Sequence, residues 1–136
     1  MTLVDTSVLL DLAQSDPVWA DWSQRQLEVV AVRGPLLLNP IVYAELGASY
    51  PTLEALDSFV ETLGLEWSDV PREALFLASK AHMDYRRRGG RRTGVLPDFF
   101  IGAHALVMGV PLLTRDRRRY ETSFPALALI APDRTQ

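Results

Sequence analysis

Short apolar runs alternate with longer stretches of helical periodicity along this chain of 136 residues. The short runs are rich in leucine, valine and isoleucine and have the length of buried strands; they lie at 2–4, 36–38, 65–67, 110–114 and 126–130. The longer stretches predict helices at 7–13, 17–30, 40–50, 52–63, 71–88 and 96–108. Strands separated by helices in this way form a parallel sheet with helices on both faces, so the pattern predicts an α/β fold.

Residues suited to helix ends stand at the boundaries of the predicted helices. Thr6 or Ser7 can cap the first helix, and Asn39 precedes a proline that suits the first helical position. Gly64 and Gly109 follow helical stretches at the place where a left-handed residue often ends a helix. The boundaries agree with the periodicity, and residues 1–136 are expected to form a single domain.

Composition narrows the class of protein. The chain has no cysteine, which excludes disulfides and cysteine chemistry. Its sequence contains no apolar run near the ~20 residues that a membrane-spanning helix needs, and no basic segment precedes the first apolar run. We therefore expect a cytoplasmic, soluble protein with no membrane association.

Arginines are concentrated in two places, although the net charge is −3. The two runs hold nine of the 14 basic residues: Arg86, Arg87, Arg88, Arg91 and Arg92, then Arg115, Arg117, Arg118 and Arg119. Basic runs in a mildly acidic chain favour a local site for a polyanion. The alternative is that each run is a solvated helix end.

Four acidic residues are expected at one edge of the sheet. Asp5 and Asp116 follow the first and fourth predicted strands. Glu45 lies just inside the helix after the second strand, and Asp98 begins the helix that leads into the fourth. These positions meet at the carboxyl edge of a parallel sheet, where open α/β folds bind ligands. Carboxylates gathered there repel one another unless a cation lies among them, and Mg²⁺ or Mn²⁺ is the natural occupant. Taken singly, each acid has another interpretation, as a turn residue, a helix N-terminal acid, an arginine partner or a surface residue.

Four segments in this order resemble the PIN-domain ribonucleases, and among them the VapC-type toxins of type II toxin–antitoxin pairs. They are Leu3-Val4-Asp5-Thr6-Ser7, Tyr43-Ala44-Glu45-Leu46, the ten-residue run Leu96–Ala105, and Leu113-Thr114-Arg115-Asp116 with Tyr120 beyond. The resemblance covers essentially the whole chain. It implies a three-layer α/β/α sandwich with a central parallel sheet of about five strands in the order 3-2-1-4-5.

The resemblance also implies the chemistry of the acidic residues. It gives catalytic and metal-binding roles to Asp5, Glu45, Asp98 and Asp116. The cofactor is then Mg²⁺ or Mn²⁺, and the reaction is hydrolysis of RNA phosphodiesters by metal-activated water.

Hydroxyl and guanidinium groups are expected to assist with the substrate. The residues given this role are Thr6, Thr114, Arg86, Arg87, Arg88 and Arg115. Some relatives place a further acidic or amide residue a few positions after the last aspartate. This chain has Arg117, Arg118 and Arg119 there.

The toxin resemblance implies partners: RNA as substrate, a cognate antitoxin that occupies the crevice, and a second copy in a homodimer. Trp19, Trp22 and Tyr43 could form a groove for an antitoxin helix, or could complete the protein's own core. Other functions stay open: a PIN-fold RNA-binding protein, a housekeeping nuclease with no toxin role, and a DNA nuclease of related fold. A phosphatase with Asp5 as nucleophile is disfavoured, because Ser7 stands where a second aspartate would be expected.

Overall fold

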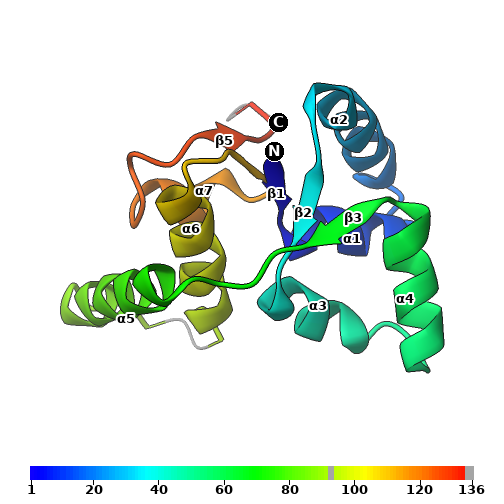
Figure 1. Cartoon of the computed structure of the whole chain (residues 1–136). Helices are drawn as coiled ribbons and strands as arrows, with labels where there is room; N and C mark the ends of the chain where they lie inside the picture. Colours follow the sequence, from blue (N-terminus) through cyan, green and yellow to red (C-terminus); the bar gives the residue numbers. More distant parts are fainter. Residues whose placement is uncertain (92–93, 134–136) are drawn as a thin grey trace.

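Figure 1 shows the computed structural model of the chain, which describes residues 1–91 and 94–133. Parallel strands form a five-stranded sheet in the order β3-β2-β1-β4-β5, which confirms the predicted topology. The strands are β1 (Thr2–Val4), β2 (Leu36–Leu38), β3 (Leu65–Trp67), β4 (Leu112–Leu113) and β5 (Leu129–Ile130). The helices in these residues are α1 (Thr6–Ala13), α2 (Ala20–Arg33), α3 (Pro40–Gly47), α4 (Leu53–Thr62), α5 (Arg72–Arg87), α6 (Leu96–Met108) and α7 (Arg117–Glu121).

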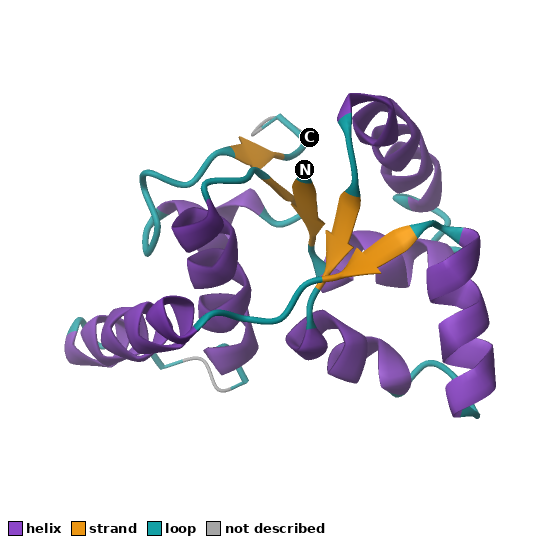
Figure 2. Ribbon diagram, in the orientation of Figure 1, coloured by secondary structure: helices purple, strands orange, loops and turns teal. Residues whose placement is uncertain are grey.

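Helices lie on both sides of the sheet. In Figures 1 and 2, α5 and α6 lie to one side of the strands, whereas α2 and α4 lie to the other. α5 packs along α6, and α1 packs against both α2 and α3. The strand order accounts for this arrangement, because a right-handed crossover puts its helices on a side that depends on the direction of travel along the sheet. The chain moves one way from β1 to β3 and then returns past β1 to reach β4, so the helices before and after this reversal lie on opposite sides.

The central strand β1 positions the candidate site. It lies between β2 and β4, is buried along its whole length, and pairs Val4 with Leu113 of β4. Because the strands are parallel, their carboxyl ends reach the same edge of the sheet. The residues that directly follow β1, β2 and β4 are Asp5, Asn39 and Thr114.

Some predicted boundaries were wrong. β4 and β5 are shorter than the apolar runs 110–114 and 126–130, because strand pairing covers only Leu112–Leu113 and Leu129–Ile130. The second helix begins at Ala20 and not at 17, because the Asp16 carboxylate accepts hydrogen bonds from the backbone N–H groups of residues 18 and 19 in a turn before it. Helix α7 was not predicted.

The cap of α1 is also different from the prediction. Asp5 caps this helix, and its Oδ1 accepts a hydrogen bond of 2.8 Å from the Thr6 backbone N–H. The hydroxyls of Thr6 and Ser7 are used elsewhere, since they donate to Glu45 and to Asp5 respectively. The predicted cap at Asn39 is confirmed, because its side chain accepts from a backbone N–H in the first turn of α3.

Glycines end two helices as expected. Gly64 and Gly109 both have a φ of 68°, in the left-handed region that favours glycine. Arg92 of the first arginine run lies outside the described residues. Among the helices described, none is both long enough and apolar enough to cross a bilayer.

Candidate active site

The carboxylate of Asp5 is buried at the end of β1 and accepts hydrogen bonds at both oxygens. Oδ1 accepts from the Thr6 backbone N–H at 2.8 Å and from the Tyr120 hydroxyl at 3.0 Å. Oδ2 accepts from the Ser7 hydroxyl at 3.0 Å and from the Thr114 hydroxyl at 2.6 Å. The donors come from the first two residues of α1, from the residue after β4 and from α7, and together they fix the orientation of this carboxylate.

The environment of Asp5 changes its pKa. Burial raises the pKa of the Asp5 carboxyl above its ordinary value, and the negative charge of Asp116 adds to the rise. Hydrogen bonds from Thr114, Tyr120 and Ser7 lower the pKa without cancelling the effect of burial. A positive charge brought near Asp5 would therefore stabilise its ionised form.

Tyr120 remains a donor to Asp5 at neutral pH. Its side chain is fully buried, and burial together with the nearby negative charges of Asp5 and Asp98 raises the pKa of the phenol well above its ordinary value. The close packing of α7 on α6 holds this ring in place. A Cβ atom at Gly102 of α6 would lie 2.6 Å from the Phe124 ring and 3.1 Å from the Tyr120 ring.

Thr114 joins two of the predicted acids. Its hydroxyl donates to Asp5 and accepts a hydrogen bond of 3.0 Å from the backbone N–H of Asp116. The Thr114 hydroxyl therefore connects the buried carboxylate to the backbone of Asp116, at the start of α7.

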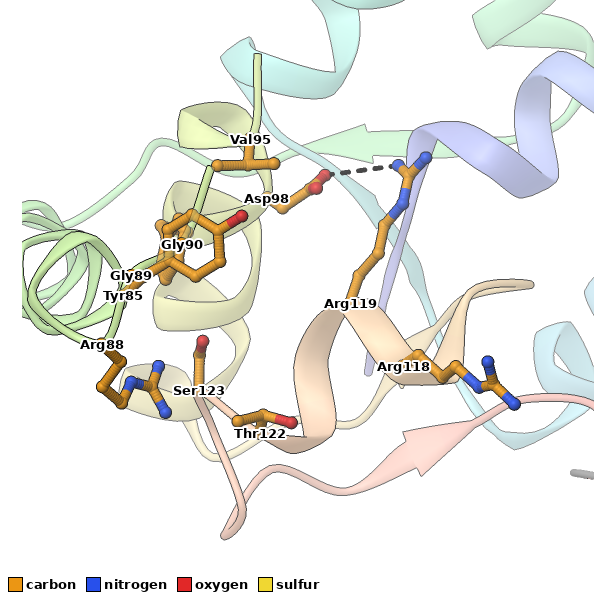
Figure 3. Close-up of a pocket in the computed structure, with 11 residues that line it drawn as sticks. Tyr85, Arg88, Gly89, Gly90, Val95, Asp98, Arg118, Arg119, Thr122 and Ser123 are labelled. Atoms are coloured by element: carbon orange, nitrogen blue, oxygen red, sulfur yellow. Dashed lines mark ion pairs between the residues drawn. The ribbon is translucent and has the colours of Figure 1, made fainter. Parts of the chain in front are cut away.

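Arg119 lies between Asp98 and Asp116. Its Nη1 is 3.6 Å from Oδ1 of Asp98, and its Nε is 3.7 Å from Oδ2 of Asp116. Figure 3 shows the Arg119 side chain extending from α7 to the Asp98 carboxylate at the start of α6. Burial lowers the pKa of Arg119, but the charges of Asp98, Asp116 and Asp5 more than compensate and raise it. The negative charge of this cluster is therefore met by an arginine of the same chain.

Glu45 reaches the site from α3. Its Oε1 accepts a hydrogen bond of 2.6 Å from the Thr6 hydroxyl, so Glu45 is connected to the residue that follows Asp5. Thr6 and Thr114, which were predicted to assist with substrate, instead donate to acidic residues in this structure. Their role toward RNA remains a prediction.

The acidic side chains of this site are the candidate ligands of a divalent cation. Within residues 1–91 and 94–133, no group of three or more His, Asp or Glu side chains is spaced to hold a metal ion. However, Mg²⁺ often binds through one or two carboxylates and retains several waters. Asp98 and Asp116 form such a pair, because both already face one cationic group. This pair fits a hydrated divalent cation, and the metal-binding roles of Asp5 and Glu45 remain predictions.

A pocket of about 340 Å³ opens beside Asp98. It lies between the end of α5, the start of α6 and the α7 region, as Figure 3 shows. Its lining combines aromatic rings, arginines, hydroxyls and two glycines: Tyr85, Phe99, Arg88, Arg118, Arg119, Thr122, Ser123, Gly89 and Gly90, with Val95 and Asp98. Arg119 therefore borders both the acidic pair and this pocket.

The predicted substrate arginines are in different environments. Arg86, Arg87 and Arg88 are exposed at the end of α5, and Arg88 lines the pocket. Arg115 has a structural contact instead: its Nε donates to the buried Asp11 carboxylate at 3.0 Å. Contact of Arg115 with RNA stays a prediction, and it would compete with this ion pair.

No site role was predicted from the sequence for Ser7 or Tyr120, and Arg119 was included only as a member of the second arginine run. Spacing offered signals for two of them, because Tyr120 and Arg119 lie four and three residues after Asp116, on the same side of any helix that begins there. The hydroxyl of Ser7 has no such signal, since the same residue serves equally well as a helix cap.

Comparison with known proteins gives one family and a set of similar folds. The family model described as "PIN domain" matches residues 2–125. No curated protein matches the chain.

The similar solved structures include three complexes. One is a complex of VapBC2 from Rickettsia felis with a DNA fragment from the VapBC2 promoter. A chain of this complex has a TM-score of 0.74 and 20% identity, and the match covers 97% of this chain and 98% of that one. A chain of VapBC-1 from nontypeable Haemophilus influenzae has a TM-score of 0.70 and 18% identity, with 96% of each chain covered. A chain of a toxin–antitoxin complex from Klebsiella pneumoniae has a TM-score of 0.69 and 18% identity, with 98% of each chain covered. At these identities the likeness is one of fold over nearly the full length.

Proposed function

The chain belongs to the PIN domain family, and on that premise we propose that it is a divalent-metal-dependent endoribonuclease that acts as the toxin of a toxin–antitoxin pair. One observation carries the proposal. At the carboxyl edge of the sheet, Thr114 connects the buried Asp5 to the backbone of Asp116, and Arg119 forms ion pairs with both Asp116 and Asp98. Such an arrangement suits a site that holds positive charge against a phosphodiester.

The proposed metal site centres on the acidic pair. Asp98 and Asp116 would hold Mg²⁺ or Mn²⁺, with Asp5 and Glu45 contributing directly or through water. The bound ion would lower the pKa of a water and neutralise charge on the phosphate. The products of the proposed hydrolysis carry 5′-phosphate and 3′-hydroxyl ends.

The chain's own residues prepare this site. Four hydrogen bonds hold the Asp5 carboxylate in one orientation, so little reorganisation is needed when positive charge arrives. The Thr6 hydroxyl holds Glu45 toward the same edge of the sheet. The Tyr120 phenol stays protonated and cannot add a further negative charge to the cluster.

The pocket beside Asp98 is proposed to receive an unpaired nucleotide of the RNA. Tyr85 offers aromatic surface to a base, while Arg88 and Arg118 offer guanidinium groups to phosphates. Unpaired bases can enter such a pocket, whereas the deep major groove of a duplex excludes side chains. Arg86 and Arg87 extend the basic surface along the end of α5.

An antitoxin and a second copy of the chain are the proposed protein partners. The proposal is supported by structural neighbours that come from VapBC and other toxin–antitoxin complexes. The aromatic residues predicted to form a groove pack in pairs: Trp19 edge-on to Trp22, and Tyr43 edge-on to Trp67. Trp19, Trp22 and Tyr43 are half-buried and Trp67 is exposed, so these pairs leave aromatic area for a partner helix.

Two experiments test the function. The purified protein is incubated with a mixed RNA pool and Mg²⁺ or Mn²⁺, and the new ends are sequenced. Recurrent new 5′-phosphate ends are expected from the wild type and not from Asp116→Asn; a pool that remains intact would contradict the nuclease.

The toxin role needs a separate measurement. The chain is expressed alone and together with the protein encoded immediately upstream. Growth arrest of cells that express it alone, rescue on co-expression and co-purification of the pair are expected. Harmless expression of a protein that cleaves RNA in vitro would identify a housekeeping nuclease instead, and binding of RNA without cleavage would identify an RNA-binding protein.

A further inference from the structure

The guanidinium of Arg119 contacts two acidic residues with two different nitrogens. Nη1 faces Asp98 at 3.6 Å and Nε faces Asp116 at 3.7 Å. The Asp98 and Asp116 side chains come from the start of α6 and the start of α7, so the arginine connects two elements. These are the same two carboxylates that best fit a divalent cation.

The fold holds Arg119 at this position. The next residue, Tyr120, is fully buried and hydrogen-bonded to Asp5, and Phe124 lies against Gly102 of α6. With α7 fixed by these contacts, the Arg119 side chain extends toward Asp98. Its position is therefore set by the packing of α7.

Arg119 does not leave the acids by losing its proton. The negative charges of Asp98, Asp116 and Asp5 raise its pKa, although burial acts in the opposite direction. At any ordinary pH the guanidinium remains positively charged. It therefore leaves the carboxylates only when another cation takes its place or another anion attracts it.

We propose that Arg119 is an exchangeable cation of this site, so that its guanidinium and the divalent metal occupy Asp98 and Asp116 in alternation. The inference rests on the proposed metal-dependent function, and it adds a residue that controls how readily the metal enters. Two positive groups on the same two carboxylates repel each other, so the metal must displace the arginine. The adjoining pocket, which Arg119 also lines, gives the displaced side chain a place to meet a substrate phosphate.

Direct metal binding tests the exchange. Mn²⁺ affinity is measured by electron paramagnetic resonance of the free ion for the wild type, for Arg119→Gln and for Arg118→Gln. Arg118→Gln removes the same charge one residue away and serves as the matched control. We expect Arg119→Gln to bind Mn²⁺ about tenfold more tightly than the wild type, and Arg118→Gln to differ much less. Equal affinity of the wild type and Arg119→Gln, or weaker binding by Arg119→Gln, would overturn the exchange.

A second readout follows the guanidinium itself. In nitrogen-15 NMR spectra, Mg²⁺ should shift the Nε–H signal of Arg119, which the Arg119→Gln spectrum identifies. The Nε–H signal of Arg115 is an internal reference, because that group donates to Asp11 and should not move. An Arg119 signal that stays unchanged at saturating Mg²⁺ would also overturn the proposal.

The outcomes separate this inference from the proposed function. If Mn²⁺ binds the wild type and Arg119→Gln equally well, and Asp98→Asn abolishes that binding, the exchange is wrong while the metal site stands. If neither protein binds Mn²⁺, both the exchange and the metal-dependent function are wrong.

Discussion

The Tyr120 hydroxyl donates a hydrogen bond of 3.0 Å to Oδ1 of Asp5, although 115 residues separate them in sequence. This bond connects α7 to the end of the central strand. Because Arg119 directly precedes Tyr120, the same bond helps to hold Arg119 opposite Asp98. The arrangement of the acidic site therefore depends on one buried phenol.

Replacing Tyr120 with phenylalanine should destabilise the protein. The variant keeps the ring but removes a hydrogen bond to a buried carboxylate, and we expect the free energy of unfolding to fall by about 1–3 kcal/mol. Urea denaturation of the two proteins measures the difference. Tyr50→Phe is the control, because Tyr50 packs against Phe59 and should lose little. A change in Tyr120→Phe no larger than the control would contradict the role given to this bond.

Replacing Gly102 with alanine should also destabilise the fold and disturb α7. The added Cβ would meet the Phe124 ring at 2.6 Å, so the ring or the helix must shift. We expect a loss of about 1–3 kcal/mol, which is typical of overpacking, together with reduced RNA cleavage. Gly47→Ala at the end of α3 is a matched control, since its Cβ would meet nothing within 4 Å. Thermal unfolding that is equal for the two variants would rule out the close approach of α7 to α6.

Local sequence patterns predicted most of the fold, because they depend on neighbouring residues only. β1, β2 and β3 have the predicted bounds, and Asn39 caps α3 as expected. β4 and β5 were predicted too long, since their ends are set by pairing with adjacent strands and not by the length of an apolar run.

The candidate site was predictable only in part. The acids could be placed at one sheet edge from the order of strands and helices. The contact of Arg119 with Asp98 could not, because it depends on how the unpredicted α7 packs on α6. The ion pair of Arg115 with Asp11 likewise follows from tertiary packing. In the sequence, Arg115 belongs to a basic run that was expected to bind a polyanion or to be solvated.

The buried His104 should make the protein less stable in mild acid. Its Nδ1 lies 3.1 Å from the Nδ2 donor of Asn39, so this nitrogen accepts and the ring is neutral. Burial lowers the pKa of His104, an effect that the charge of Asp69 opposes. The unfolded chain therefore binds a proton as the pH falls through about 6.5 while the folded protein does not, and the free energy of unfolding decreases.

The variant His104→Gln tests this pH dependence. It should be less stable than the wild type at pH 7, because a fully buried ring is lost. Between pH 7 and pH 5, however, its free energy of unfolding should fall less steeply than that of the wild type. Denaturant unfolding at several pH values measures both slopes, and identical slopes would show that His104 is not the group responsible.

The arginines at the end of α5 should contribute to RNA affinity through phosphate contacts. Changing Arg86, Arg87 and Arg88 to alanine should weaken RNA binding and flatten its salt dependence, by about 0.7 in slope for each lost contact with single-stranded RNA. Binding is measured at several salt concentrations. A control variant with the same change in net charge replaces three arginines elsewhere: Arg25, Arg33 and Arg72. Equal slopes in the two variants would mean that the α5 arginines contact solvent or a protein partner.

The central claim is that the carboxylates around Asp98 support metal-dependent RNA cleavage. The most direct measurement is the cleavage rate of one labelled RNA by the wild type and by Asp98→Asn, in excess chelator and after Mn²⁺ is added back. We predict that chelator abolishes cleavage by the wild type, that Mn²⁺ restores it, and that Asp98→Asn stays inactive under both conditions while it remains folded. Undiminished cleavage in excess chelator, or by Asp98→Asn, would contradict the account.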